Sequence, residues 1–184
     1  MVSFRVSIDS FVFVFGALLI LLFPIKWVLG FLIAAVWHEF CHYMVLYLSG
    51  ISVHGIRIGL TGIKMDIPQL PLQIEFFCAL AGPLGGFLLF LCYRWFPEAA
   101  LCALIQSLFN LLPVYPQDGG RVLRCIMQWV LPRNAETVCD TIEMLTVVVI
   151  FLFGMAFHWE LLSICTIVLL ISKIVRRKIP CKLY

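Results

Sequence analysis

Long apolar runs are the feature of this sequence that most restricts its fold. Hydrophobic residues make up 63% of the 184 residues and charged residues only 12%, whereas soluble proteins contain roughly 45 to 50% apolar residues. Six runs are candidate membrane spans, at about 1–24, 27–48, 74–93, 99–115, 141–157 and 159–174. No small-residue cleavage site follows the first run, so we expect a retained membrane helix there. The runs predict an all-α polytopic membrane protein with about six transmembrane helices.

The basic residues predict how this protein is oriented. Short cytoplasmic loops of membrane proteins carry an excess of lysine and arginine. With six spans and a cytoplasmic N-terminus, eleven of the thirteen basic residues fall on the cytoplasmic side and only Lys26 and Arg94 on the other. We therefore expect both termini in the cytoplasm, with the basic C-terminal tail at the anionic leaflet. Because the longest connection is about 25 residues, residues 1–184 are predicted to form one membrane-embedded domain.

Residues 50–68, GISVHGIRIGLTGIKMDIP, differ from the apolar runs. They alternate β-branched and polar residues and contain glycines near a turn. This pattern predicts a small cytoplasmic-side β-hairpin or short sheet after the second span. Two roles stay open for it: a plain connector, or a sheet edge that pairs with an unwound substrate strand. His54 is interpreted as a polar sheet residue.

Two histidines and a glutamate stand inside the second run, in AAVWHEFCHYMVLY, residues 34–47. An ionisable side chain in a hydrocarbon layer costs about 2.5 to 3.5 kcal/mol, so these residues need a compensating role. The letters HEFCH form an H-E-x-x-H motif, and on a helix His38 and His42 project from nearly the same face and can bind one metal ion. Glu39 lies close enough to transfer a proton without ligating the metal. This layout is typical of a zinc hydrolase.

A catalytic zinc usually has three protein ligands and one open position, so a third donor is needed. The segment NLLPVYPQDGGRV, residues 110–122, follows the fourth run and contains Asn110, Pro113, Pro116 and Asp118. Prolines three residues apart break a helix, and the glycines after Asp118 let the backbone approach closely. The carboxylate can therefore turn inward. In the six-span topology His38, His42 and Asp118 share one depth near the cytoplasmic side.

Other metal-binding side chains are weaker candidates. The eight cysteines occur singly, with no C-x-x-C pair, and are interpreted as small core hydrophobes. Cys41 stands between the two histidines, but three ligands and a water already complete a four-coordinate zinc site. His158 is expected on the outer side of the membrane, about 30 Å from Asp118, and should not bind the metal.

The two motifs together resemble the site-2 protease family of intramembrane metalloproteases. The shared pattern is H-E-x-x-H in a membrane helix followed by N-x-x-P-x-x-P-x-D-G. The six-span layout without an inserted soluble domain is similar to the compact bacterial branch, which includes sporulation-factor-processing proteases. The resemblance covers nearly the whole chain. It implies one Zn²⁺ held by His38, His42 and Asp118, with Glu39 as the general base and Asn110 near the substrate or the oxyanion.

Two positions depart from the pattern of the family. Gln117 stands where many relatives have a hydrophobic residue, and Gly86 where an asparagine is common. Gly86 ends the segment AGPLGG, residues 81–86, which we interpret as a site of close helix packing through small residues. A substrate-facing kink at Pro83 is the alternative interpretation.

The resemblance implies an intramembrane zinc metalloprotease that hydrolyses a peptide bond in or near a transmembrane or membrane-associated segment of its substrate, close to the cytoplasmic face. We expect it in the bacterial cytoplasmic membrane. Its expected partners are a membrane-tethered protein substrate, the lipid bilayer and regulatory membrane proteins. The net charge of +3 and the scattered basic residues indicate no nucleic-acid partner.

Three alternatives stay open: an inactive membrane scaffold of the same fold, a metal transporter, and a membrane metalloenzyme that acts on lipid. Metal transporters usually contain internal repeats, and no repeat is detected here. An inactive relative would most simply lack the glutamate, but Glu39 is present. Only the family resemblance argues against the lipid enzyme.

Overall fold

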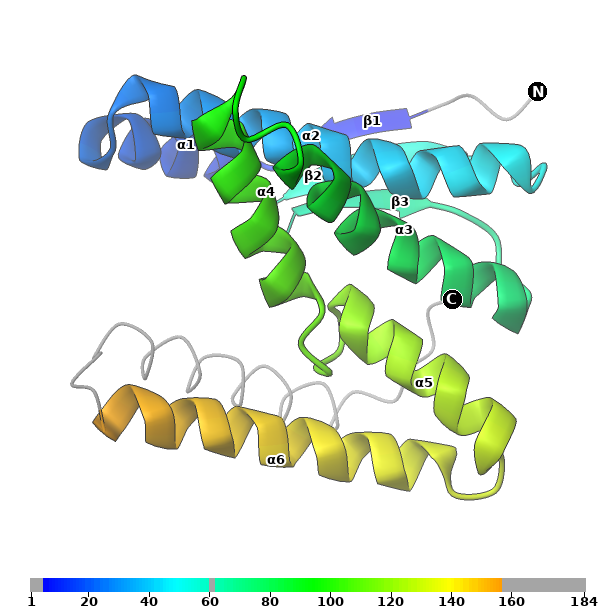
Figure 1. The fold of residues 1–184 in the computed structure, drawn as a ribbon. Coiled ribbons are helices and arrows are strands. Elements are labelled where there is room, and N and C mark those ends of the chain that lie inside the picture. The colour runs from blue at the N-terminus through cyan, green and yellow to red at the C-terminus, as the bar shows by residue number, and fades with distance from the viewer. Residues whose placement is uncertain (1–4, 60–61, 157–184) are drawn as a thin grey trace. The chain divides into compact units, whose positions relative to one another are not determined.

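The structure, a computed structural model, describes residues 5–59 and 62–156 (Figure 1). The sixth predicted span, His158 and the basic tail lie outside the described residues. The chain divides into two compact units, Met1–Leu111 and Leu112–Tyr184, and each unit is described by itself. The single domain expected from the sequence stays a prediction.

Four helices belong to the first unit: α1 (Ser10–Leu22), α2 (Ile25–Leu48), α3 (Leu72–Phe90) and α4 (Pro97–Asn110). Asp9 caps α1 by accepting a hydrogen bond of 3.3 Å from the backbone N–H of Phe11. Pro24 separates α1 from α2, because proline is tolerated at a helix start but not inside a helix. Helices α2, α3 and α4 pack against one another and form the core of this unit.

Small residues let these three helices approach closely. A Cβ atom added at Gly30 of α2 would lie 2.9 Å from the backbone nitrogen of Ala99 in α4. A Cβ atom at Gly86 of α3 would lie 2.9 Å from the carbonyl oxygen of Ala103, also in α4. The interpretation of AGPLGG as a close-packing segment is therefore confirmed, because larger side chains would separate the helix backbones.

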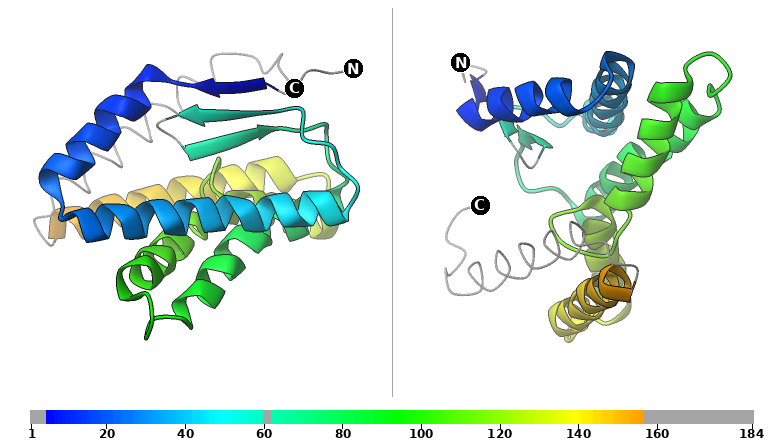
Figure 2. Two further views of the ribbon diagram at one scale, coloured as in Figure 1. Left: turned by 90° about the horizontal axis from the view of Figure 1, so that it is seen from above. Right: turned by 90° about the vertical axis from the view of Figure 1, so that its left-hand side faces the viewer.

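A three-stranded sheet completes the described part of the first unit. Its strands are β1 (Arg5–Ile8), β2 (Gly55–Gly59) and β3 (Gly62–Asp66), in the order β1-β2-β3. They lie side by side, with β2 parallel to β1 and antiparallel to β3 (Figure 2). The predicted hairpin is confirmed, and Gly62 begins β3 with a φ of 103°, which glycine adopts without strain.

Strand β1 corrects one expectation. The first run was expected to be helical throughout, but its helix begins only at Ser10. Residues Arg5–Ile8 instead pair with β2, because RVSI alternates polar and β-branched residues and finds a backbone partner in an already paired strand.

The second unit contains α5 (Asp118–Val130) and α6 (Ala135–Ala156), which pack against each other. The fourth run was expected to reach residue 115, but α4 ends at Asn110. Pro113 and Pro116 explain the difference, since each removes a backbone donor and restrains the residue before it. Helix α5 was not among the six runs, because its sequence DGGRVLRCIMQWV mixes charged and apolar residues.

Among the described residues, three helices, α2, α3 and α6, are long and apolar enough to cross a membrane, which supports a membrane protein. Helices α1 and α4 have 13 and 14 residues and extend only about 20 Å at 1.5 Å per residue. The hydrocarbon core of a bilayer is roughly 30 Å thick. The expected total of six spans, and the orientation of the termini, therefore stay predictions.

Candidate metal centre

The H-E-x-x-H motif lies on the buried face of α2. This face consists of residues one turn apart, among them Gly30, Ala34, His38, His42 and Leu46. His38 and His42 are only 6% and 7% exposed, and their Nε2 atoms are 3.1 Å apart. The structure thus places both imidazoles together on one helix face, as their spacing of four residues predicts.

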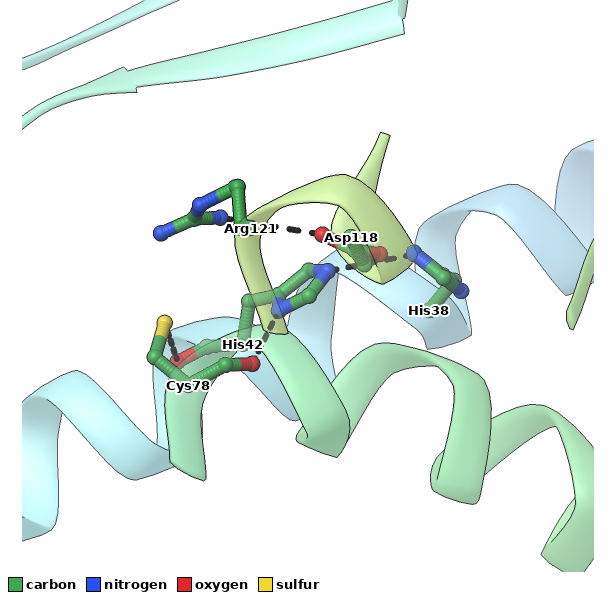
Figure 3. A network of polar contacts seen from close by, with 5 residues as sticks. All are labelled: His38, His42, Cys78, Asp118 and Arg121. Carbon is green, nitrogen blue, oxygen red and sulfur yellow. Dashed lines mark hydrogen bonds and ion pairs between the residues drawn. The ribbon is translucent and has the colours of Figure 1, made fainter. Parts of the chain in front are cut away.

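A carbonyl group of helix α3 selects the tautomer of the His42 ring. Nδ1 of this ring lies 2.7 Å from the carbonyl oxygen of Cys78 (Figure 3). A carbonyl oxygen only accepts, so Nδ1–H donates, and Nε2 of the neutral ring keeps its lone pair. Metal-binding histidines commonly make such a second contact, which fixes their tautomer and orientation. His42 is therefore a preoriented nitrogen donor.

The space beside the two rings fits a zinc ion. Two nitrogens bound tetrahedrally to zinc at 2.0–2.1 Å lie about 3.3 Å apart, close to the observed 3.1 Å. Both Nε2 atoms face Gly82 of α3, where an added Cβ would lie 2.5 Å from Nε2 of His38 and closer still to that of His42. Because glycine has no side chain, Gly82 leaves space next to both nitrogens.

Asp118 lies in the second unit, as the first residue of α5. It is 7% exposed, and its Oδ1 is 3.6 Å from Nη1 of Arg121, one turn further along (Figure 3). The backbone N–H groups at a helix start also favour a negative charge. An added Cβ at Gly120 would lie 2.6 Å from the backbone nitrogen of Tyr115, so the expected close backbone approach is observed. The role of Asp118 as third ligand stays a prediction.

The other two predicted site residues belong to helices of the first unit. Glu39 is half-buried next to His38 on α2, and Asn110 is the half-buried last residue of α4. Helices α2 and α4 pack against each other. The assignment of Glu39 as general base and of Asn110 as an oxyanion contact stays a prediction.

The weaker candidates have structural roles where the structure describes them. Cys41 faces Gly85 of α3, where an added Cβ would clash with its Sγ, so the thiol packs between α2 and α3. His54 is exposed and its backbone N–H donates to the carbonyl oxygen of Asp66, 2.8 Å away. It extends the sheet, as expected.

Sequence reasoning missed two contributors to this site, both on α3. The carbonyl of Cys78 carries no signal in the sequence, because every residue has one. Gly82 was noticed only as part of a packing segment, although it also makes room at the histidine nitrogens. Gly82 lies four residues after Cys78, so both residues are on one face of a helix. This spacing could have indicated that Gly82 also faces the histidines.

Comparisons with known proteins agree with the site-2 protease resemblance. No family model matches the chain. A zinc metalloprotease of Methanocaldococcus jannaschii is 28% identical over 109 residues, which cover 52% of this chain. The match spans only 32% of the length of that relative. The solved structure of a site-2 protease from M. jannaschii is 21% identical, with a TM-score of 0.65, and the match covers 92% of this chain and 88% of that one. The resemblance is thereby confirmed at the level of the fold, which this chain shares with that site-2 protease.

Proposed function

We propose that this chain is an intramembrane zinc metalloprotease. It hydrolyses a peptide bond in or near a transmembrane or membrane-associated segment of a protein substrate, close to the cytoplasmic face. The observation that carries the proposal is the pair of buried imidazoles, with Nε2 atoms 3.1 Å apart, in a helix apolar enough to cross a membrane. Ionisable residues are costly in such helices and mark functional sites.

His38, His42 and Asp118 are the zinc ligands in this proposal. All three are buried, and imidazole nitrogens and carboxylate oxygens are donor atoms that zinc binds. Two imidazoles and one carboxylate leave the fourth position of a tetrahedral site open. The carbonyl of Cys78 orients His42, and Arg121 restrains the carboxylate of Asp118.

Zinc, when bound, polarises a carbonyl group and lowers the pKa of water toward about 7. Glu39 accepts a proton from the attacking water and delivers it to the leaving amine, as a general base and then a general acid. The side-chain amide of Asn110 donates to the oxygen on which negative charge develops. A substrate helix must first unwind locally, because its peptide groups are hydrogen-bonded within the helix.

The proposed setting follows from the charge distribution of the sequence and from the family resemblance. The excess of lysine and arginine places both termini and the site on the cytoplasmic side, and the resemblance to the compact bacterial branch implies the bacterial cytoplasmic membrane. The partners are a membrane-tethered protein substrate, the surrounding lipid and regulatory membrane proteins. A cut near the cytoplasmic face releases a soluble product.

The first experiment measures zinc per chain in detergent-purified protein. We expect near-stoichiometric zinc in wild type and in Glu39→Gln, because the glutamate is not a ligand. His42→Ala and Asp118→Ala should lose the metal, while His54→Ala, at an exposed histidine, is the matched control. A zinc-free wild type, or full retention in Asp118→Ala, would contradict the ligand set.

A cleavage assay separates the protease from an inactive scaffold of the same fold. Wild type and Glu39→Gln are reconstituted in vesicles with single-span polypeptides whose helices are interrupted by glycines. Zinc-dependent cleavage by wild type, lost in Glu39→Gln, supports the protease. A zinc-loaded wild type that cuts no faster than Glu39→Gln would favour the scaffold.

A further inference from the structure

Helix α6 contains a carboxylate that the proposed reaction does not use. The side chain of Glu143 is 2% exposed, in a helix apolar enough to cross a membrane. It belongs to the buried face of α6, together with Ala135, Cys139 and Val147. A buried carboxylate in apolar surroundings is costly unless it is paired. Packing alone therefore does not account for a glutamate at this position.

Arg124 of α5 is the charged partner of this carboxylate. Its Nη2 lies 3.9 Å from Oε1 of Glu143. The arginine side chain is 39% exposed, so it is partly accessible while its Nη2 end lies near the buried carboxylate. The pair joins α6 to α5, the helix that begins with Asp118.

Arg124 has a second contact, with the loop before α5. Its guanidinium carbon lies 4.7 Å from the centre of the Tyr115 ring, within the range of a cation–π interaction. The loop also packs on the first turn of α5, where an added Cβ at Gly120 would lie 2.6 Å from Val114 and Tyr115 backbone atoms. Arg124 therefore connects Glu143 with the loop that leads into Asp118.

We propose that Glu143 is a positioning residue that acts through Arg124. Glu143 holds the guanidinium, the guanidinium holds the Tyr115 ring, and the ring fixes residues 112–117 against the start of α5. This arrangement restrains the carboxylate of Asp118 from the loop side, while Arg121 contacts it from the helix side. Its importance for metal binding rests on the proposed function, in which Asp118 is a zinc ligand.

The role differs from simple packing in one testable respect. Glutamine nearly matches the shape of glutamate but carries no charge, so Glu143→Gln fills about the same space and removes the ionic attraction for Arg124. A packing role predicts little change in this variant. A positioning role predicts a looser loop and weaker metal binding, because ligand-orienting groups contribute about 10- to 100-fold to metal affinity.

The experiment measures two quantities on the full-length protein in detergent. Amide hydrogen exchange of residues 111–121 in the metal-free protein reports local opening of the loop. Competition with a chelator gives the dissociation constant for Zn²⁺. The variants are Glu143→Gln, Arg124→Gln and their double mutant. Glu136→Gln, the same change at an exposed position on α6, is the matched control.

We expect each single variant to exchange on the order of tenfold faster in this segment and to bind zinc about tenfold more weakly. The double mutant should be no worse than Arg124→Gln alone, because Glu143 acts through Arg124 in this proposal. If Glu143→Gln does not fold, the two measurements on Arg124→Gln test the proposal, since the Arg124 side chain is partly exposed.

The outcomes distinguish this inference from the proposed function. Exchange equal to that of Glu136→Gln, additive effects in the double mutant, or an unchanged zinc affinity would overturn the positioning role. A wild type without zinc would overturn the proposed function, and with it the importance of Glu143 for metal binding. Faster exchange in that protein would still support the restraint on the loop, because exchange is measured without metal.

Discussion

The two units keep polar side chains in apolar surroundings in different ways. In the first unit, two ring N–H groups donate to backbone carbonyls: Nδ1 of His42 donates to Cys78 and Nε1 of Trp37 donates to Gly85, 2.8 Å away. In the second unit, two carboxylates lie beside opposite charges, in the Arg121–Asp118 and Arg124–Glu143 pairs. Neutral rings need close backbone approach, and charged groups need a countercharge. The first unit should therefore be sensitive to added volume, and the second to lost charge.

Gly82 tests, with the largest expected effect, whether the first unit is sensitive to added volume. Gly82→Ala adds one methyl group where both histidine Nε2 atoms meet, so we expect at least about a tenfold loss of zinc affinity. Chelator competition measures the effect. Gly16→Ala is the control, because nothing lies within 4 Å of a Cβ added there. Unchanged affinity in Gly82→Ala would show that this space is not needed for metal binding.

Glycine at position 86 tests packing without the metal. A Cβ at this position would meet Ser107 Oγ and the backbone of Ala103, so Gly86→Ala should destabilise the protein by about 1–3 kcal/mol through overpacking. The free energy of unfolding can be measured by titration with a denaturing detergent. Zinc per chain in the folded fraction should stay at the wild-type level. Stability equal to that of Gly16→Ala would refute the close contact between α3 and α4.

The Tyr115 ring tests the second unit with the smallest expected effect. Tyr115→Leu keeps an apolar side chain but removes the ring under Arg124, which should cost about 0.5–1 kcal/mol. Hydrogen exchange of residues 111–121 should rise by a few-fold, because leucine keeps apolar packing and loses only the attraction between the ring and Arg124. Tyr47→Leu, at an exposed tyrosine of α2, is the control. Exchange equal to that of Tyr47→Leu would show that the ring does not link Arg124 to the loop.

Local patterns in the sequence predicted much of the fold and part of the site. The hairpin at residues 55–66 followed from alternation and glycines, and the pairing of His38 with His42 followed from a spacing of one helical turn. Two elements were not predicted, for identifiable reasons. Strand β1 depends on a partner fifty residues away, and α5 has too many charged residues to stand out by hydropathy.

Composition and short-range patterns were enough to predict a membrane-embedded chain, two imidazoles on one helix face, and prolines that separate Asp118 from the preceding helix. These features depend on composition and on contacts within about one turn of helix. The packed helices were needed to show which carbonyl orients His42, which glycine makes room beside it, and which carboxylate lies near Arg124. Those contacts join residues on different helices, and their geometry depends on how closely the backbones pack, which no local pattern encodes.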